Sequence, residues 1–195
     1  MPEMSQGPGA STTKANKVRP SEIVSFWRDA GPQAWFKKDQ DFDAEIRRRF
    51  LDIHEDAAEG LLIDWETNAE GTLALVILLD QFPRNMFRGQ ARMYASDSLA
   101  RALAAGAIVR GFDALVAKEM RSFFYLPFMH SEAMADQLRS VAFYKTIEDA
   151  DGLRWAEEHA DIIRRFGRFP HRNVVLGRAS TPEELAFLAA GGFSG

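Results

Sequence analysis

Two histidines stand beside acidic and basic residues in patterns that suit proton transfer and anion binding. His130 lies two residues before Glu132, and His171 lies next to Arg172. An imidazole can exchange a proton near neutral pH, and a neighbouring carboxylate can orient it. Arginine offers a planar fork of donors that binds a carboxylate or a phosphate through two hydrogen bonds. The candidate catalytic residues are His130, His171, Glu132 and Asp80.

Arginine outnumbers lysine 18 to 6 and is concentrated in two turns. The stretch 164–178 holds five arginines and no acid, while Arg84 and Arg88 lie in an earlier turn. Structural ion pairs often imitate functional sites, and Asp80 and Glu132 are available as partners. Seven arginines against two acids still leave a surplus of positive charge for an anionic ligand. The predicted ligand-binding residues are Arg84, Asn85, Arg88, His130, His171, Arg172, Asn173 and Arg178.

The composition excludes several kinds of chemistry. The chain has no cysteine, which removes thiolate nucleophiles, disulfides and iron–sulfur clusters. The chain has four histidines but no H-E-x-x-H motif, so no metal site is expected. It also has no glycine-rich phosphate loop, so no cofactor is expected. The net charge of -4 argues against nucleic acid as a partner and leaves at most a local patch for it, over residues 164–178. A small anionic ligand or an acidic peptide remains as the expected partner, and the oligomeric state stays open.

The chain has no apolar run that approaches the roughly 20 residues of a membrane-spanning helix. The N-terminus also lacks the apolar region of a secretion signal. We therefore expect no membrane segment and a cytoplasmic location.

The elements that position these residues are expected to be helices, since apolar residues recur at helical spacing and no convincing alternation typical of a strand occurs. Phe42, Ile46 and Phe50 predict a helix from about residue 41 to 59 that ends at Gly60. The apolar run 73–79 predicts a buried helix. Further helices are expected over 97–105, 112–124, 131–148 and 153–166.

Two helix starts carry the pattern of a capping box, in which two side chains satisfy free backbone N–H groups. Thr67 with Glu70 predicts one ahead of the buried run. Thr181 with Glu184 predicts the other, at the start of the last helix.

Proline is expected to end three helices, at Pro83, Pro127 and Pro170, because it lacks a backbone donor and disfavours helical backbone before it. Polar residues follow each proline, so we expect the three turns to converge on one site. The segments 82–89 and 169–177 resemble each other and form a weak internal repeat.

The repeat predicts that its equivalent residues have equivalent surroundings. Phe82 and Phe169 should both be buried. Asn85 and Asn173 should make similar hydrogen bonds to backbone groups.

Three long motifs resemble those of a bacterial family known only as a domain of unknown function. They read LDQFPRN at 79–85, PFMHSE at 127–132 and RFGRFPHRN at 165–173. The resemblance covers roughly residues 21–188 and implies a compact helical fold similar to that of tetratricopeptide-repeat proteins. It implies no activity, so no catalytic residue follows from it.

We therefore expect an all-α fold of about eight helices, with helical hairpins in a compact, right-handed, tetratricopeptide-like array. Residues 1–19 are expected to form a flexible tail before a single domain over 20–195. The leading hypothesis is a cytoplasmic protein that binds a small anionic ligand or an acidic peptide group in an Arg- and His-lined pocket. One alternative is a hydrolase-type enzyme that uses His130 or His171 with Asp80 or Glu132. Another is a scaffold without a small-molecule site.

Overall fold

The computed structural model describes residues 18–194, and this part of the chain is helical and contains no strand. Most of the predicted tail lies outside the described residues, whereas Val18 packs against the core. The elements are α1 (Pro20–Ala30), α2 (Pro32–Trp35), α3 (Gln40–Ala58), η1 (Ile63–Thr67), α4 (Ala69–Val76), the π-helical η2 (Ile77–Gln81), α5 (Phe82–Met86), η3 (Ala91–Tyr94), α6 (Asp97–Val109), η4 (Phe112–Ala114), η5 (Lys118–Phe124), α7 (Leu126–Met129), α8 (Met134–Thr146), α9 (Ala150–Phe166), η6 (Pro170–Arg172) and α10 (Pro182–Ala189).

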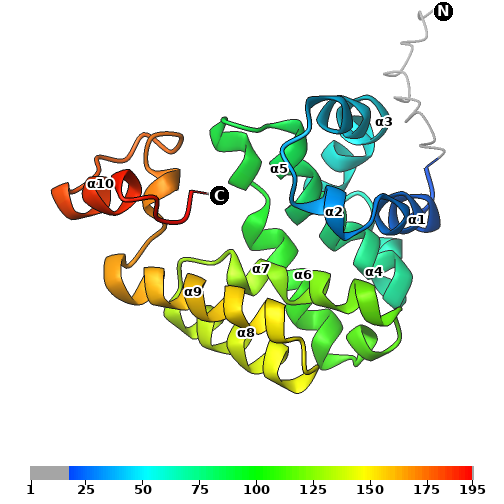
Figure 1. Ribbon diagram of the computed structural model, residues 1–195. Helices are drawn as coiled ribbons and strands as arrows, with labels where there is room; N and C mark the ends of the chain where they lie inside the picture. Colours follow the sequence, from blue (N-terminus) through cyan, green and yellow to red (C-terminus); the bar gives the residue numbers. More distant parts are fainter. Residues whose placement is uncertain (1–17, 195) are drawn as a thin grey trace, which may run out of the picture.

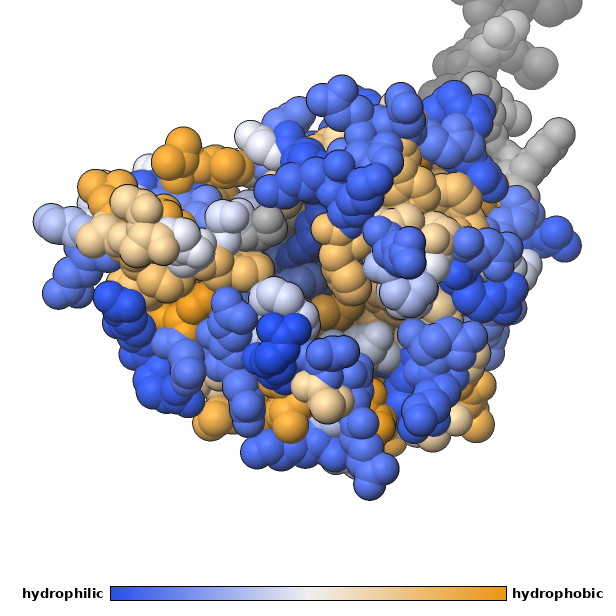
Figure 2. Space-filling model, viewed as in Figure 1, coloured by the Kyte–Doolittle hydropathy of each residue, from blue (hydrophilic) through white to orange (hydrophobic). Residues whose placement is uncertain are grey.

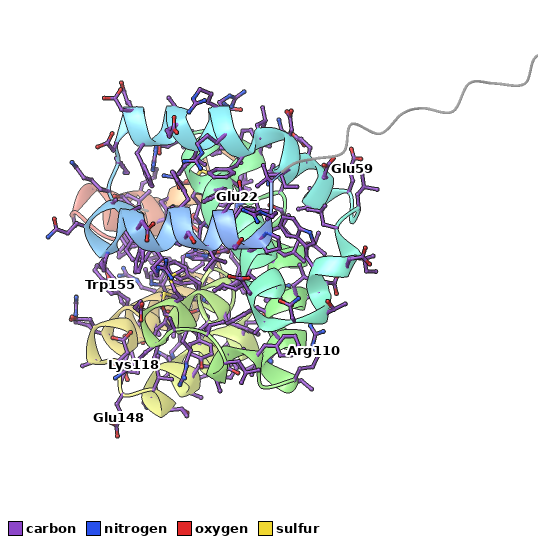
Figure 3. All side chains as sticks on the ribbon, turned by 90° about the vertical axis from the view of Figure 1, so that its right-hand side faces the viewer. Glu22, Glu59, Arg110, Lys118, Glu148 and Trp155 are labelled. Carbon is purple, nitrogen blue, oxygen red and sulfur yellow. The ribbon has the colours of Figure 1, made fainter. Side chains whose placement is uncertain are left out.

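The helices form a body and a C-terminal arm. In the body, α8 and α9 lie side by side, and α1 to α6 gather at the other end (Figure 1). Figure 3 looks onto that end, and α1 and α3 both run along the side that faces the viewer. The ring of Phe26 on α1 stacks with that of Phe42 on α3, with centroids 5.6 Å apart. We call residues 167–194, which contain η6 and α10, the C-terminal arm. No helix of residues 18–194 has the length and apolar character to cross a membrane.

Two hydrophobic cores hold these parts. The main core lies in the body and is centred on aromatic rings, with Phe82 5.0 Å from Phe50 and 5.6 Å from Trp27 between centroids. A smaller core joins the arm to the end of α9 through Ile162, Ile163 and Phe169. The arm is therefore attached to the body through α9. The tetratricopeptide-like arrangement stays a prediction.

Several predicted helix boundaries are confirmed. Helix α3 spans 40–58 and is followed by Gly60, whose φ of 73° is easily adopted by glycine. The capping box of Thr181 and Glu184 is present at the start of α10. The region 112–124 instead forms two short 3₁₀ helices, because Ala117 between them has extended backbone (φ -54°, ψ 141°).

The predicted capping box of Thr67 and Glu70 is wrong by one residue. Asn68 caps α4, and its side-chain oxygen accepts a hydrogen bond of 2.9 Å from the backbone N–H of Gly71. The hydroxyl of Thr67 instead donates to the carbonyl of Asp64. Asparagine competes well with threonine at this position, because its short side chain reaches the same free donors.

The prediction that three prolines end helices is wrong at Pro83, whereas η5 and α9 do end shortly before Pro127 and Pro170, at Phe124 and Phe166. Pro83, Pro127 and Pro170 each stand in the first turn of a short helix, α5, α7 and η6 respectively. At Pro127 and Pro170 the missing N–H of proline costs little, since the first N–H groups of a helix have no intrahelical partner. At Pro83, moreover, the chain continues as a helix from α4 through η2 into α5.

The π-helical turn is what carries this helix through Pro83. The N–H of Phe82 donates to the carbonyl of Ile77, one residue further back than in an α-helix, which frees the carbonyl of Leu78. Pro83 has no N–H to donate to the carbonyl of Leu79, which is therefore free as well. Two buried carbonyls thus need other donors.

Side chains from distant segments supply those donors. His54 of α3 donates through Nδ1 to the carbonyl of Leu78 at 2.9 Å. The hydroxyl of Ser96, just before α6, donates to the carbonyl of Leu79 at 2.6 Å. The π-helical turn is thus held in place by two neighbouring elements.

We predict that Ser96→Ala lowers the free energy of unfolding by about 1–3 kcal/mol, because it leaves the buried carbonyl of Leu79 without a donor. Ser98→Ala, an exposed change on α6, is the matched control and should have little effect. Urea unfolding of both variants measures the difference. Equal stability of the two would contradict the role given to Ser96.

Candidate functional site

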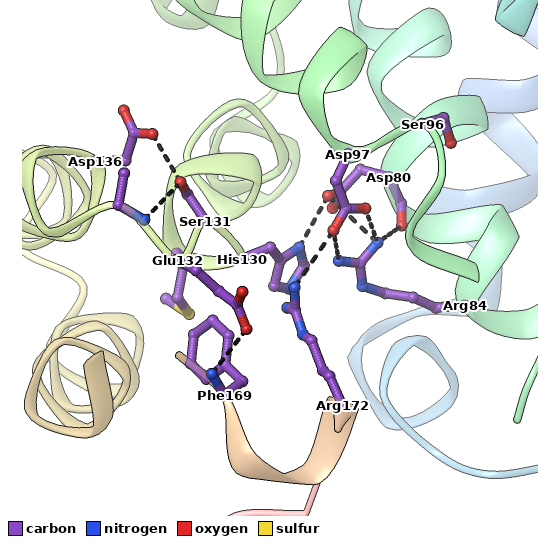
Figure 4. Close-up of polar contacts among 12 residues, drawn as sticks. Asp80, Arg84, Ser96, Asp97, His130, Ser131, Glu132, Asp136, Phe169 and Arg172 are labelled. Atoms are coloured by element: carbon purple, nitrogen blue, oxygen red, sulfur yellow. Dashed lines mark hydrogen bonds and ion pairs between the residues drawn. The ribbon is translucent and has the colours of Figure 1, made fainter. Parts of the chain in front are cut away.

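The side chain of Asp80 is fully buried at the π-helical turn, with 0% exposure. One carboxylate oxygen accepts a hydrogen bond from the amide of Gln81. The other lies 2.9 Å from Nδ1 of His130 and 3.5 Å from the guanidinium of Arg84 (Figure 4). Burial opposes ionisation, but Arg84 and His130 outweigh it and lower the pKa of Asp80 to about 2. Asp80 is therefore charged at neutral pH.

His130 lies just after α7, where its backbone N–H donates to the carbonyl of Leu126. Because Asp80 is an acceptor, Nδ1 of His130 is the donor, and Nε2 keeps its lone pair. No hydrogen bond within residues 18–194 uses Nε2, and 14% of the side chain is exposed. Burial and the charge of Arg84 lower the pKa of His130. The ring is therefore a neutral, oriented base at pH 7.

Asp97 is a member of this site that the sequence did not single out. Its carboxylate accepts two hydrogen bonds from Arg84, at 2.9 and 3.0 Å, and lies 3.7 Å from Nη1 of Arg172. The only signal in the sequence is its place in the first turn of α6. An aspartate there is expected for helix stability alone.

Arg172 is a buried cation that is incompletely paired in the described structure. It is 7% exposed, and its Nε atom is buried without a hydrogen-bond partner in the described structure. Its guanidinium carbon lies 4.5 Å from the ring centroids of both Tyr94 and Phe169. Burial and the charge of Arg84 lower the pKa of Arg172. A buried cation with so little compensation is an unusual and costly feature.

His171 precedes Arg172 in η6 and faces aromatic rings. Its ring lies 5.7 Å from Phe169 and 5.2 Å from Phe193, and its buried Nδ1 has no partner in the described structure. Burial and the charge of Arg172 lower the pKa of His171 to about 3. No carboxylate orients this ring, so of the two histidines only His130 has the arrangement of an acid–base group.

Glu132 does not orient His130, because it is bound elsewhere. Its carboxylate accepts two hydrogen bonds from Arg178, at 2.7 and 2.9 Å. It also accepts the backbone N–H of Phe169 at 2.8 Å. Glu132 therefore connects the loop after α7 to the C-terminal arm, and Asp80 is the partner of His130.

The two repeated turns have separate sets of partners. Phe82 and Phe169 are both fully buried, as predicted. The prediction that the asparagines bind backbone groups is wrong, because each amide donates to a carboxylate. The partners of the predicted ligand-binding residues outside the Asp80 network are Asp43 for Asn85 and Arg88, Glu184 and Ser180 for Asn173, and Glu132 and Asn173 for Arg178.

Acids from outside the motifs thus reduce the surplus of arginines. Asp43 pairs with Arg88, and Glu184 pairs with Arg168 at 2.6 Å. Asp161 pairs with Arg164 on the surface. After these pairs are made, Arg172 is the buried arginine that shares its nearest carboxylate with another arginine.

The surface is hollowed between the C-terminal arm and the body, and hydrophilic residues lie at the bottom of the hollow (Figure 2). Two other concavities, of about 480 Å³ beside α1 and about 530 Å³ between α9 and α10, are lined by neither Asp80, His130 nor Arg172. Among residues 18–194 no group of three His, Asp or Glu side chains is placed to hold a metal ion.

These observations define an all-helical protein with a buried Asp–His–Arg network between its body and a C-terminal arm. Residues 23–192 match the family described as bacterial protein of unknown function (DUF924), and the chain belongs to this family. The structure is similar to that of the protein of unknown function ATU0120 from Agrobacterium tumefaciens, with 51% sequence identity and a TM-score of 0.86. The similarity covers 88% of this chain and 97% of the other. The comparison with curated proteins finds no match.

The lowered pKa of His171 predicts a pH dependence of stability. Unfolded, its pKa is near 6.5, and folded it is about 3. As the pH falls from 6.5 towards 4, the unfolded state takes up a proton that the folded state excludes, so the free energy of unfolding falls. His171→Gln should make this slope shallower by up to about 1.4 kcal/mol per pH unit. Urea unfolding between these pH values measures it, and parallel profiles of wild type and variant would contradict it.

We predict that two arginines contribute very different amounts to stability. Arg84→Met removes the arginine that pairs with both Asp80 and Asp97 and should cost about 3–5 kcal/mol of the free energy of unfolding. Arg172→Met keeps the apolar part of the side chain and leaves Asp97 paired with Arg84, so it should cost less than about 1 kcal/mol. Urea unfolding compares them. Equal losses would mean that Arg172 is as well paired as Arg84.

Proposed function

We propose that this protein binds a small oxyanion, a phosphate or a carboxylate group, at the guanidinium of Arg172. The observation that carries the proposal is the incomplete pairing of Arg172, whose buried Nε has no partner in the described structure and whose nearest carboxylate also serves Arg84. An anion would supply the counter-charge that Asp97 has to divide between two cations.

The surroundings of Arg172 favour an oxyanion bound in the plane of the guanidinium. Tyr94 and Phe169 lie close to the guanidinium, each with its ring centroid at 4.5 Å. Rings this close limit the movement of the group, and its N–H edge is the part that can donate to a ligand. Arginine binds phosphate and carboxylate through that edge with paired hydrogen bonds. The burial of Arg172 favours a small ligand over an acidic peptide.

We predict that inorganic phosphate or acetate raises the melting temperature of the wild type, because a ligand that binds only the folded state stabilises it. At about 100 times the dissociation constant, the stabilisation is about 2.7 kcal/mol. Arg172→Met should lose the shift. Arg164→Met, which changes an exposed arginine of the same basic stretch, should keep it.

Chloride at equal ionic strength separates specific binding from screening. A shift that chloride reproduces, or one that Arg172→Met retains, would contradict the proposed site. In that case the scaffold hypothesis becomes the better explanation of the fold.

A second candidate function is hydrolysis, and the Asp80–His130 pair supports it. The pair has the arrangement of an orienting carboxylate and a general base. His130 Nε2 would take a proton from water as the water oxygen bonds to a phosphorus or carbonyl carbon. The departing oxygen would then take up the proton as its bond breaks. Arg172 would hold the negative charge of the substrate.

Hydrolysis predicts turnover of phosphate monoesters or carboxylic esters by the wild type. His130→Gln should lower kcat by about 100-fold or more, because general base catalysis contributes roughly that factor. Steady-state rates on a panel of nitrophenyl esters test this. Glu157→Gln, an exposed change on α9, is a control for trace contamination, and it should retain the rate of the wild type. Absence of turnover by the wild type on the whole panel would reject hydrolysis and leave binding.

A further inference from the structure

The C-terminal arm is held together by its own contacts. Glu184 of α10 accepts hydrogen bonds from Arg168 at 2.6 and 2.8 Å and from the amide of Asn173 at 3.1 Å. It also accepts the backbone N–H of Thr181 at 2.7 Å, and it is only 2% exposed. These bonds tie the first turn of the arm to α10, so the arm is a unit with internal cohesion.

The arm contacts the body in two chemically different ways. Towards α9 the contacts are apolar, with Phe187 on Phe166 at 5.1 Å between ring centroids and Phe169 in the small core with Ile162. Gly167, with φ 70°, ends α9 and begins the arm. Apolar contacts of this kind need no fixed direction, so this side suits a pivot.

Towards α6 and α7 the contacts are polar, and we call this side the seam. Across it, Arg172 lies 3.7 Å from Asp97 and packs on the ring of Tyr94, and Arg178 binds Glu132. Glu132 and Arg178 are 28% and 25% exposed, so water reaches both partners of this ion pair. In Figure 4, Arg172 reaches upward from the arm towards Asp97 and Arg84 of the body.

Closing the seam brings two guanidinium groups to one carboxylate. Arg84 already makes two hydrogen bonds to Asp97, so Arg172 gains only a longer contact while its Nε loses water. Repulsion between the two cations and the desolvation of Arg172 both oppose closure. The hollow between arm and body lies along this junction (Figure 2).

We propose that the C-terminal arm opens and closes along the seam, pivoting on its contacts with α9, and that an oxyanion bound to Arg172 holds it closed. This inference rests on the proposed function. An anion adds negative charge where two cations face one carboxylate, so it binds the closed form more tightly than the open one. Such a difference in affinity shifts the population towards the closed form.

Spin labels can test this directly, because the chain has no cysteine and labels attach only where one is introduced. One pair, Val174→Cys on the arm and Gln90→Cys on the body, spans the seam, and both positions are exposed. A control pair, Gln90→Cys and Leu138→Cys, lies within the body. The distance distribution of each pair is measured by pulsed electron paramagnetic resonance, with and without inorganic phosphate.

We expect the pair across the seam to show two distances without phosphate and mainly the shorter one with it. When phosphate binds only the closed form, a concentration of about 100 times the dissociation constant of that form raises the ratio of closed to open forms about 100-fold, and weaker selectivity gives a smaller rise. The control pair should not change. Arg172→Met should abolish the response to phosphate, while Arg164→Met should retain it.

Calorimetric titration of the same labelled proteins separates the two hypotheses. Phosphate binding without a change in distance would overturn closure and leave the proposed function intact. Absence of phosphate binding would overturn both. Glu132→Gln tests the seam without any ligand. It weakens the contact with Arg178 and should increase the population with the longer distance. The control Glu157→Gln, on the surface of α9, should leave this population unchanged. An unchanged distribution in Glu132→Gln would also overturn the opening movement.

Discussion

Asp80 carries its charge inside the protein, and several elements are arranged around it to compensate that charge. Burying a carboxylate is expensive unless it is paired and hydrogen-bonded. Gln81 and Arg84 satisfy it from its own helix, and His130 satisfies it from the end of α7. Arg84 in turn binds Asp97 at the start of α6. One buried charge thus connects three helical segments of the body, the one that contains Asp80 and the ends of α6 and α7.

The π-helical turn shows where prediction of the fold from sequence succeeds and where it fails. The buried run 73–79 predicts a helix correctly, because apolar spacing and helix formation are both local properties. Its continuation through Pro83 depends on donors that are distant along the chain. Ser96 is 17 residues from Leu79, and His54 is 24 residues from Leu78. A local pattern contains no information about such partners. Pro83 therefore predicts the end of a helix, although tertiary hydrogen bonds allow the helix to continue.

Prediction of the candidate site from the sequence succeeds and fails for the same reason. Asp80, His130 and Arg172 stand out in the sequence because acidic, basic and imidazole groups gather near proline. The pairing of Asp80 with His130 spans 50 residues and could not be chosen over the nearer Glu132. Asp97 was missed because a first-turn aspartate has an ordinary role in helix stability. The types of chemistry could therefore be predicted, whereas the partners had to be read from the fold.

The arginines of the C-terminal arm pair in an order that a purely structural network does not explain. The free-energy cost of placing a cation in the protein rises as its exposure to water falls. The least exposed arginine should therefore have the best-placed carboxylate. Arg168 and Arg178 are 28% and 25% exposed, yet each has a carboxylate at hydrogen-bonding distance. Arg172 is 8% exposed at its side chain and has only a shared carboxylate at 3.7 Å. This inverse order gives the proposal of an anionic ligand its physical basis, because a ligand can supply the partner that the protein does not.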